Sequence, residues 1–188
     1  MTTMSGTSSD SMWEVSTRTI VYAAIGAALY AVTAQFQFAL PGTANVFLRP
    51  SFALVTFFGF AFGPIVGLFV GFVGNAIGDQ ISGFGLLTYW NWSVANGLAG
   101  FIAGWWALSM MRGAGSNRLV SAVIASAVGV VVGFAFVFTD LFIGSAASFS
   151  VALTDNYIPV VVGNLLVACI LTPILVAAWE PVRASIGR

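Results

Sequence analysis

The chain has 188 residues, of which 59% are hydrophobic and only 6% are charged, and its mean hydropathy is +0.99. So little polar surface excludes a soluble globule of this size and indicates an integral membrane protein. Six Arg balance six acidic residues, and the absence of Lys and His excludes a basic nucleic-acid surface, an ATP-binding P-loop and a Ser-His-Asp nucleophile.

These exclusions predict a chain that is not an enzyme and that binds neither nucleic acid nor a cofactor. No metal site is expected either, since the single Cys169 lies in an apolar run without a His or a second Cys. We interpret it as a buried small side chain.

The chain is expected to begin with a short tail and to continue as one membrane domain. Residues 1–17 are rich in Ser and Thr and contain Asp10 and Glu14, unlike the basic start of a signal peptide. We expect a disordered cytoplasmic tail there, followed at 18–188 by the membrane domain.

The first predicted helix covers residues 19–40 and carries small residues at a spacing of four. Ala23, Ala27 and Ala31 therefore share one helix face, with Ala24 and Ala28 beside them. Such a face either packs on a neighbouring helix of the same chain or docks a separate membrane protein.

The number of membrane spans depends on residues 51–78, which carry no charge. They are long enough for one tilted span, or for two short ones that break at Gly63-Pro64. With one span the six Arg divide equally between the two sides. With two spans, Arg49 lies alone on one side of the membrane. The other side then holds Arg18, Arg112, Arg118, Arg183 and Arg188. Because Arg accumulates in short cytoplasmic loops, we favour an all-α polytopic fold with six transmembrane helices and both termini cytoplasmic.

The remaining spans are predicted at residues 92–111, 119–142 and 157–179, with a compact turn at 112–118 and an outer loop at 145–156. Glycines recur every fourth residue at Gly59, Gly63, Gly67 and Gly71, which predicts that these helices approach their neighbours closely.

Polar and aromatic residues gather on the predicted outer side, around residues 79–96. Asn75 and Asp79 share one helix face, as do Trp92 and Asn96 on the next helix. Buried amides and carboxyl groups need hydrogen bonds, which a polar heterocycle stacked on Trp or Tyr supplies. The candidate substrate-binding residues are Arg49, Asn75, Asp79, Tyr89, Trp90, Asn91, Trp92, Asn96, Asp140, Asn156, Tyr157 and Asn164.

Structural roles remain open for each of these residues. Trp90, Trp92 and Tyr157 are also typical of an interfacial aromatic belt, and the asparagines of hydrogen bonds between helices. For Asp140 and Asp155, the alternative is that each is a solvated charge in a loop. Arg49 is either a loop charge or the partner of Asp79 in a salt bridge.

The chain resembles the substrate-binding S components of energy-coupling factor (ECF) transporters. The resemblance extends over nearly all of the chain after Thr17, and rests on size, topology, the alanine strip and three motifs. The motifs are Leu48-Arg49-Pro50-Ser51-Phe52, Phe58-Gly59-Phe60-Ala61-Phe62-Gly63-Pro64 and Gly74-Asn75-Ala76-Ile77-Gly78-Asp79.

The resemblance implies a prokaryotic multi-pass membrane protein that captures a vitamin or related micronutrient. Its partners would be membrane lipid, a transmembrane coupling protein that docks on Ala23, Ala27 and Ala31, and two ATPases that drive import. The segment 79–92 would form part of the gate. Three outer acids against one Arg lean towards a cationic or neutral aromatic heterocycle, such as thiamine or a precursor. The alternatives are a structural or regulatory membrane protein without a ligand, and a small solute facilitator.

Overall fold

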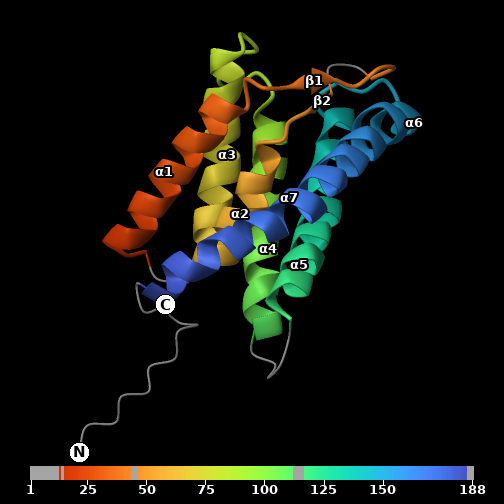
Figure 1. The fold of residues 1–188 in the computed structure, drawn as a ribbon. Coiled ribbons are helices and arrows are strands. Elements are labelled where there is room, and N and C mark those ends of the chain that lie inside the picture. The colour runs from red at the N-terminus through yellow and green to blue at the C-terminus, as the bar shows by residue number, and fades with distance from the viewer. Residues whose placement is uncertain (1–12, 14, 44–45, 112–116, 186–188) are drawn as a thin grey trace, which may run out of the picture.

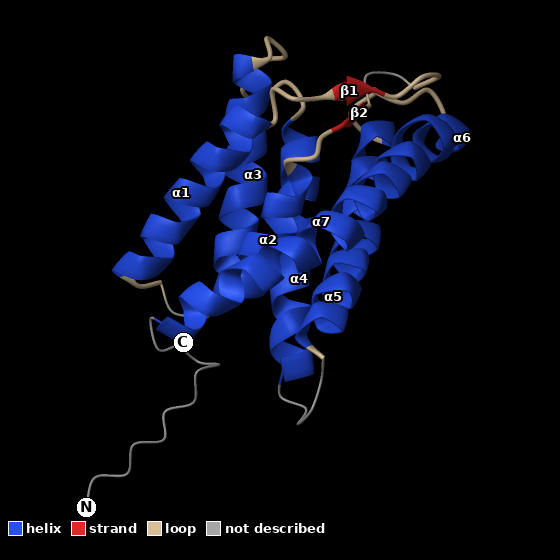
Figure 2. Ribbon diagram, viewed as in Figure 1, coloured by secondary structure: helices blue, strands red, loops and turns tan. Residues whose placement is uncertain are grey.

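The computed structural model describes residues 13, 15–43, 46–111 and 117–185, and most of them are helical (Figures 1 and 2). The fold is all-α apart from one short hairpin. The elements in chain order are α1 (Thr17–Thr33), β1 (Phe38–Ala39), β2 (Phe47–Leu48), α2 (Phe52–Phe62), α3 (Pro64–Ile81), α4 (Trp90–Met111), α5 (Arg118–Gly133), a 3₁₀ helix (Phe134–Leu141), α6 (Phe149–Val151), a π-helix (Ala152–Tyr157) and α7 (Ile158–Ser185).

The apolar run at residues 51–78 forms two helices. Gly63 has φ of 109°, a conformation that favours glycine, and Pro64 occupies the first turn of α3. The break predicted at Gly63-Pro64 is therefore present.

Glycines bring the backbones of α2, α3 and α4 into direct contact. A Cβ atom at Gly59 or Gly67 would meet the carbonyl oxygen of Gly100, and one at Gly100 would meet that of Gly67. The close helix packing expected from the glycine spacing is confirmed.

The first helix is shorter than predicted. It ends at Thr33 rather than residue 40, and β1 then pairs antiparallel with β2, placing Phe38 opposite Leu48 and Ala39 opposite Phe47. The continuous apolar pattern of the helix stops at Gln35-Phe36-Gln37-Phe38, where polar and apolar side chains alternate, and of these four residues Phe38 belongs to β1.

The last predicted loop also differs from the structure. Residues 145–156, expected to be irregular, include α6 and most of the π-helix, which leads directly into α7. The span predicted at 119–142 is α5 followed by the tighter 3₁₀ helix. Helix α7 continues to Ser185, beyond both Pro173 and Pro181.

The two ends of the bundle differ in charge. Helix α1 begins and α7 ends at one end, and the hairpin lies at the other (Figure 1). The starts of α1 and α5 and the end of α7 carry Arg18, Arg118 and Arg183, whereas Arg49 follows β2 at the hairpin end. Residues 112–116 of the predicted turn, with Arg112, and nearly all of the predicted tail at 1–17 fall outside the described residues.

Three helical stretches among the described residues are long and apolar enough to cross a membrane: Pro64–Ile81, Arg118–Leu141 and Phe149–Ser185. Thr17–Thr33 and Phe52–Phe62 are shorter apolar helices. These helices point to a membrane protein.

Candidate functional site

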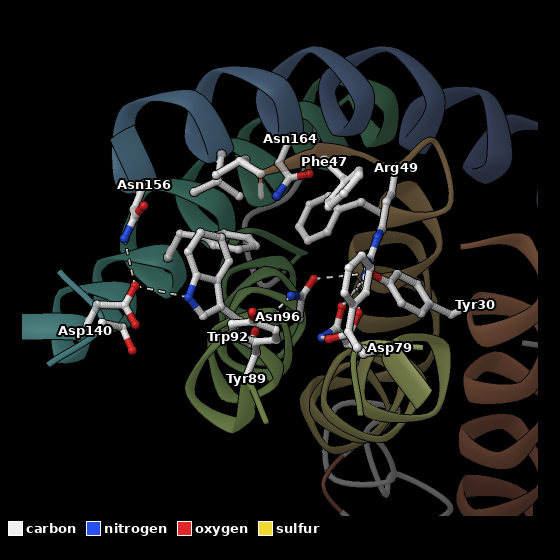
Figure 3. A pocket seen from close by; sticks show the side chains of 17 residues that line it. Tyr30, Phe47, Arg49, Asp79, Tyr89, Trp92, Asn96, Asp140, Asn156 and Asn164 are labelled. Carbon is white, nitrogen blue, oxygen red and sulfur yellow. Dashed lines mark hydrogen bonds and ion pairs between the residues drawn. The ribbon is translucent and has the colours of Figure 1, made fainter. Parts of the chain in front are cut away.

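A cavity of about 320 Å³ lies at the hairpin end of the bundle (Figure 3). This volume is near the lower limit for small-molecule sites, roughly 300–1,000 Å³. Its walls combine polar and aromatic side chains: Tyr30, Val46, Phe47, Arg49, Phe52, Asn75, Asp79, Phe84, Tyr89, Trp92, Asn96, Phe134, Asp140, Ser145, Asn156, Val160 and Asn164.

One wall is a buried network centred on Arg49. The Arg49 Nη2 atom lies 2.8 Å from Asp79 Oδ1, and Nη1 donates to Asn75 Oδ1 at 2.9 Å. Asn75 in turn donates to Asp79 Oδ2 and to Ser93 Oγ, at 2.9 and 3.0 Å. With the Tyr30 hydroxyl 3.2 Å from Asn75 Oδ1, every hydrogen-bonding position of the Asn75 amide is used.

Arg49 also connects the hairpin to this wall. It follows β2, and its Nε donates to Gln37 Oε1 at 2.9 Å, just before β1. Burial by itself would lower the pKa of Arg49, but Tyr30 and Asp79 beside it raise the pKa above its usual value. The guanidinium therefore stays charged while it holds the hairpin against α3, and the salt bridge that the sequence left as an alternative is present.

The opposite wall is organised around Asp140, at the end of the 3₁₀ helix. Asn91 Nδ2 donates to its Oδ1 at 2.7 Å, while Trp92 Nε1 and Asn156 Nδ2 donate to Oδ2 at 3.1 and 2.9 Å. Asp140 is only 2% exposed. Three donors from two other segments thus satisfy a carboxyl group that burial would otherwise penalise.

Aromatic rings complete the cavity. Phe47 of the hairpin and Phe84 of the 82–89 segment lie 5.4 Å apart between ring centroids, so the two segments meet over the site. Phe52 and Phe134 lie 5.6 Å apart deeper in the wall. Together with Trp92 they offer flat apolar surfaces for a planar ligand.

Most candidate residues from the sequence line the cavity, and three do not. Asn91 is buried behind the wall, where it supports Asp140. Trp90 is 42% exposed, and its ring makes a T-shaped contact with that of Phe136. The Tyr157 hydroxyl donates to the Val131 carbonyl, so its role is in helix packing.

Sequence reasoning missed the apolar part of the lining and Tyr30. Phe52 and Phe134 belong to long apolar runs, where nothing distinguishes a wall residue from a core residue. Phe47 and Phe84 gave a signal, since Phe47 lies beside a polar connection and Phe84 lies in the predicted gate segment 79–92. Tyr30 places a hydroxyl group in an apolar helix, and a buried tyrosine hydroxyl usually has a hydrogen-bonding partner.

The alanine strip lies inside the protein. Ala23, Ala27 and Ala31 are 6%, 3% and 2% exposed, and the α3 glycines Gly74 and Gly78 lie against this face of α1. In this conformation the strip is an intramolecular packing face, unlike the docking face that we expected. Small side chains permit this close approach of α1 and α3.

Fold and site together define a helical membrane protein with a vitamin-sized polar cavity at one end. The sequence model of the family described as "ECF-type riboflavin transporter, S component" matches residues 14–180. The chain belongs to this family of transporter S components, which are not enzymes.

A curated relative is a UPF0397 protein of Vibrio atlanticus (strain LGP32), 39% identical over 89 residues. The match covers 47% of this chain and 48% of the relative, so the chain spans about half the length of this curated relative. No solved structure matches the chain.

Proposed function

We propose that the protein is the substrate-capture subunit of an ECF-type, ATP-driven importer for a vitamin or related micronutrient. The observation that carries the proposal is the cavity at the hairpin end, whose wall combines aromatic side chains with buried amides and carboxyl groups. Family membership supports it. A structural membrane protein without a ligand has no need for such a cavity. Apolar side chains would fill the space by close packing, and they would avoid the cost of burying polar groups.

The charged groups of the cavity lining are Arg49, Asp79 and Asp140. Asp79 is compensated by Arg49, whereas Asp140 accepts three hydrogen bonds from neutral donors. Asp155, which the sequence counted among the outer acids, does not line the cavity. Of the three outer acids, only Asp140 is thus left for a cationic ligand such as thiamine. Riboflavin, a neutral aromatic heterocycle named in the family description, is the first candidate.

The proposed arrangement in the membrane has six spans and a cytoplasmic face at the end that carries Arg18, Arg118 and Arg183. The cavity then faces outward in a prokaryotic cell membrane. Residues 1–17 form the cytoplasmic tail and 18–188 the membrane domain. The partners are a transmembrane coupling protein and two ATPases, since the described residues contain no energy-converting module.

Docking of the coupling protein is assigned to the exposed face of α1. Ala24 and Ala28 are exposed, on the face of α1 next to the buried strip, and they are flanked by Val21, Ile25 and Leu29. Small residues flanked by apolar ones allow a second helix to approach closely within the membrane.

Substitutions on the two faces of α1 should therefore differ. Ala28→Trp is expected to leave ligand binding unchanged and to reduce recovery of the coupling protein in a co-purification at least tenfold. Ala27→Trp is expected to lower the yield of folded protein, since Ala27 is 3% exposed against α3. If the Ala27→Trp variant folds normally but no longer co-purifies with the coupling protein, the docking face is the strip of Ala23, Ala27 and Ala31 instead.

Uptake tests the proposed function. In cells that cannot make riboflavin, the chain expressed with a coupling protein and its two ATPases should support accumulation of labelled riboflavin, and an ATPase-inactive control should not. The chain alone in liposomes should bind the vitamin but allow no flux. Flux through the chain alone would identify a facilitator and contradict the proposal.

A further inference from the structure

Asn164 differs from the other asparagines of the cavity wall. It lies on α7, is 6% exposed, and its side chain points into the cavity (Figure 3). No described residue donates to or accepts from its amide, although Asn75, Asn91, Asn96 and Asn156 are all hydrogen-bonded. Its amide is also not sealed from the cavity, unlike the unpaired hydroxyls of Ser51 and Ser126.

The unpaired amide of Asn164 selects among ligands by the hydrogen bonds that they offer. Water bonds to this amide while the cavity is empty, and a ligand that displaces the water must replace those bonds or leave a buried amide unsatisfied. Asn156, Val160 and Asn164 recur at every fourth residue and all line the cavity, so one face of this helical segment forms its wall. The Asn156 Nδ2 atom donates a hydrogen bond to Asp140, whereas neither the donor nor the acceptor of the Asn164 amide bonds to a described residue.

The shape of the amide defines what it can pair with. An Asn side chain presents one acceptor and one donor side by side, and it binds bidentately to a ligand edge that carries a neighbouring donor and acceptor. The aromatic walls formed by Trp92, Phe52 and Phe134 require such an edge to belong to a flat ring.

We propose that Asn164 is a specificity-determining residue that recognises the lactam or imide edge of a neutral aromatic heterocycle. Its amide NH₂ donates to a ring carbonyl, and its Oδ1 accepts from the adjacent ring N–H. This inference rests on the proposed function and names the chemical class of the ligand. The two charged networks position the walls, and Asn164 selects among rings that fit between them.

The experiment measures flavin fluorescence in titrations of the full chain with riboflavin and with N3-methylriboflavin, whose imide nitrogen has no proton. Asn164→Leu should weaken riboflavin binding roughly ten- to hundredfold, as expected for two lost hydrogen bonds. Methylation should weaken binding to the wild-type protein by a similar order, and should have no further effect in the Asn164→Leu variant.

Thermal unfolding without ligand separates recognition from a structural role. Asn164→Leu should keep or raise the midpoint, since it removes an unpaired buried amide. A lowered midpoint, unchanged riboflavin affinity, or equal sensitivity of both proteins to methylation would overturn the assignment of Asn164. Failure of the wild-type protein to bind either flavin would instead contradict riboflavin as the ligand, and the inference about Asn164 would fall with it.

Discussion

Arg49→Met is expected to destabilise the protein by about 3–5 kcal/mol, because it leaves Asp79 as an uncompensated buried charge. The Asp79 side chain is only 8% exposed, and the same substitution removes the donor to Gln37 that holds the hairpin. Equilibrium unfolding in mixed micelles measures the loss. Riboflavin binding should fall as well, since the hairpin supplies Phe47 to the cavity.

Two further variants define the cause of that loss. Arg49→Met combined with Asp79→Asn should recover part of the stability, because the charge that lacked a partner is gone. Arg183→Met is the matched control at the other end of the bundle: its bridge to Glu180 joins side chains that are 35% and 34% exposed, and its removal should cost less than about 1 kcal/mol. An equal cost for Arg49 and Arg183 would refute a buried network.

Gly100→Ala is expected to destabilise the helical core strongly. The added Cβ would meet the Gly67 carbonyl and would lie 2.8 Å from Val55 Cγ1, so α3 and α4 must move apart. Overpacking of this kind costs roughly 1–3 kcal/mol. A lower midpoint of thermal unfolding, with reduced yield of folded protein, is the expected result.

Gly163→Ala is the control for that experiment. Its Cβ would meet the far end of the Leu48 side chain at 3.1 Å, a group that can rotate away, so the substitution should be nearly neutral. If both alanine variants unfold at the wild-type temperature, the close contact between the helix backbones does not contribute to stability.

The sequence was most informative where a local rule has one structural solution. Gly63-Pro64 broke the long apolar run as expected, because a positive φ followed by proline ends one helix and begins the next. Arg49, Asp79, Asn75 and Asn96 were recognised because polar groups in an apolar chain require partners.

Other features depended on contacts between distant segments. Whether the alanines of α1 face α3 or the lipid depends on the rotation of that helix, and Ala24 and Ala28 form a second strip that periodicity cannot rank against the first. The hairpin required β1 to find β2, and its alternating pattern spans only four residues. The 3₁₀ and π segments that present Asp140 and Asn156 have no comparable signal in the sequence.

A titration of the purified wild-type chain with riboflavin tests the central claim most directly. We predict that flavin fluorescence is quenched to a sharp end point at about one molecule per chain, and that excess thiamine does not compete. Absence of binding by riboflavin, thiamine and every other vitamin, under conditions in which the protein remains folded, would contradict a ligand-binding cavity and favour a purely structural membrane protein.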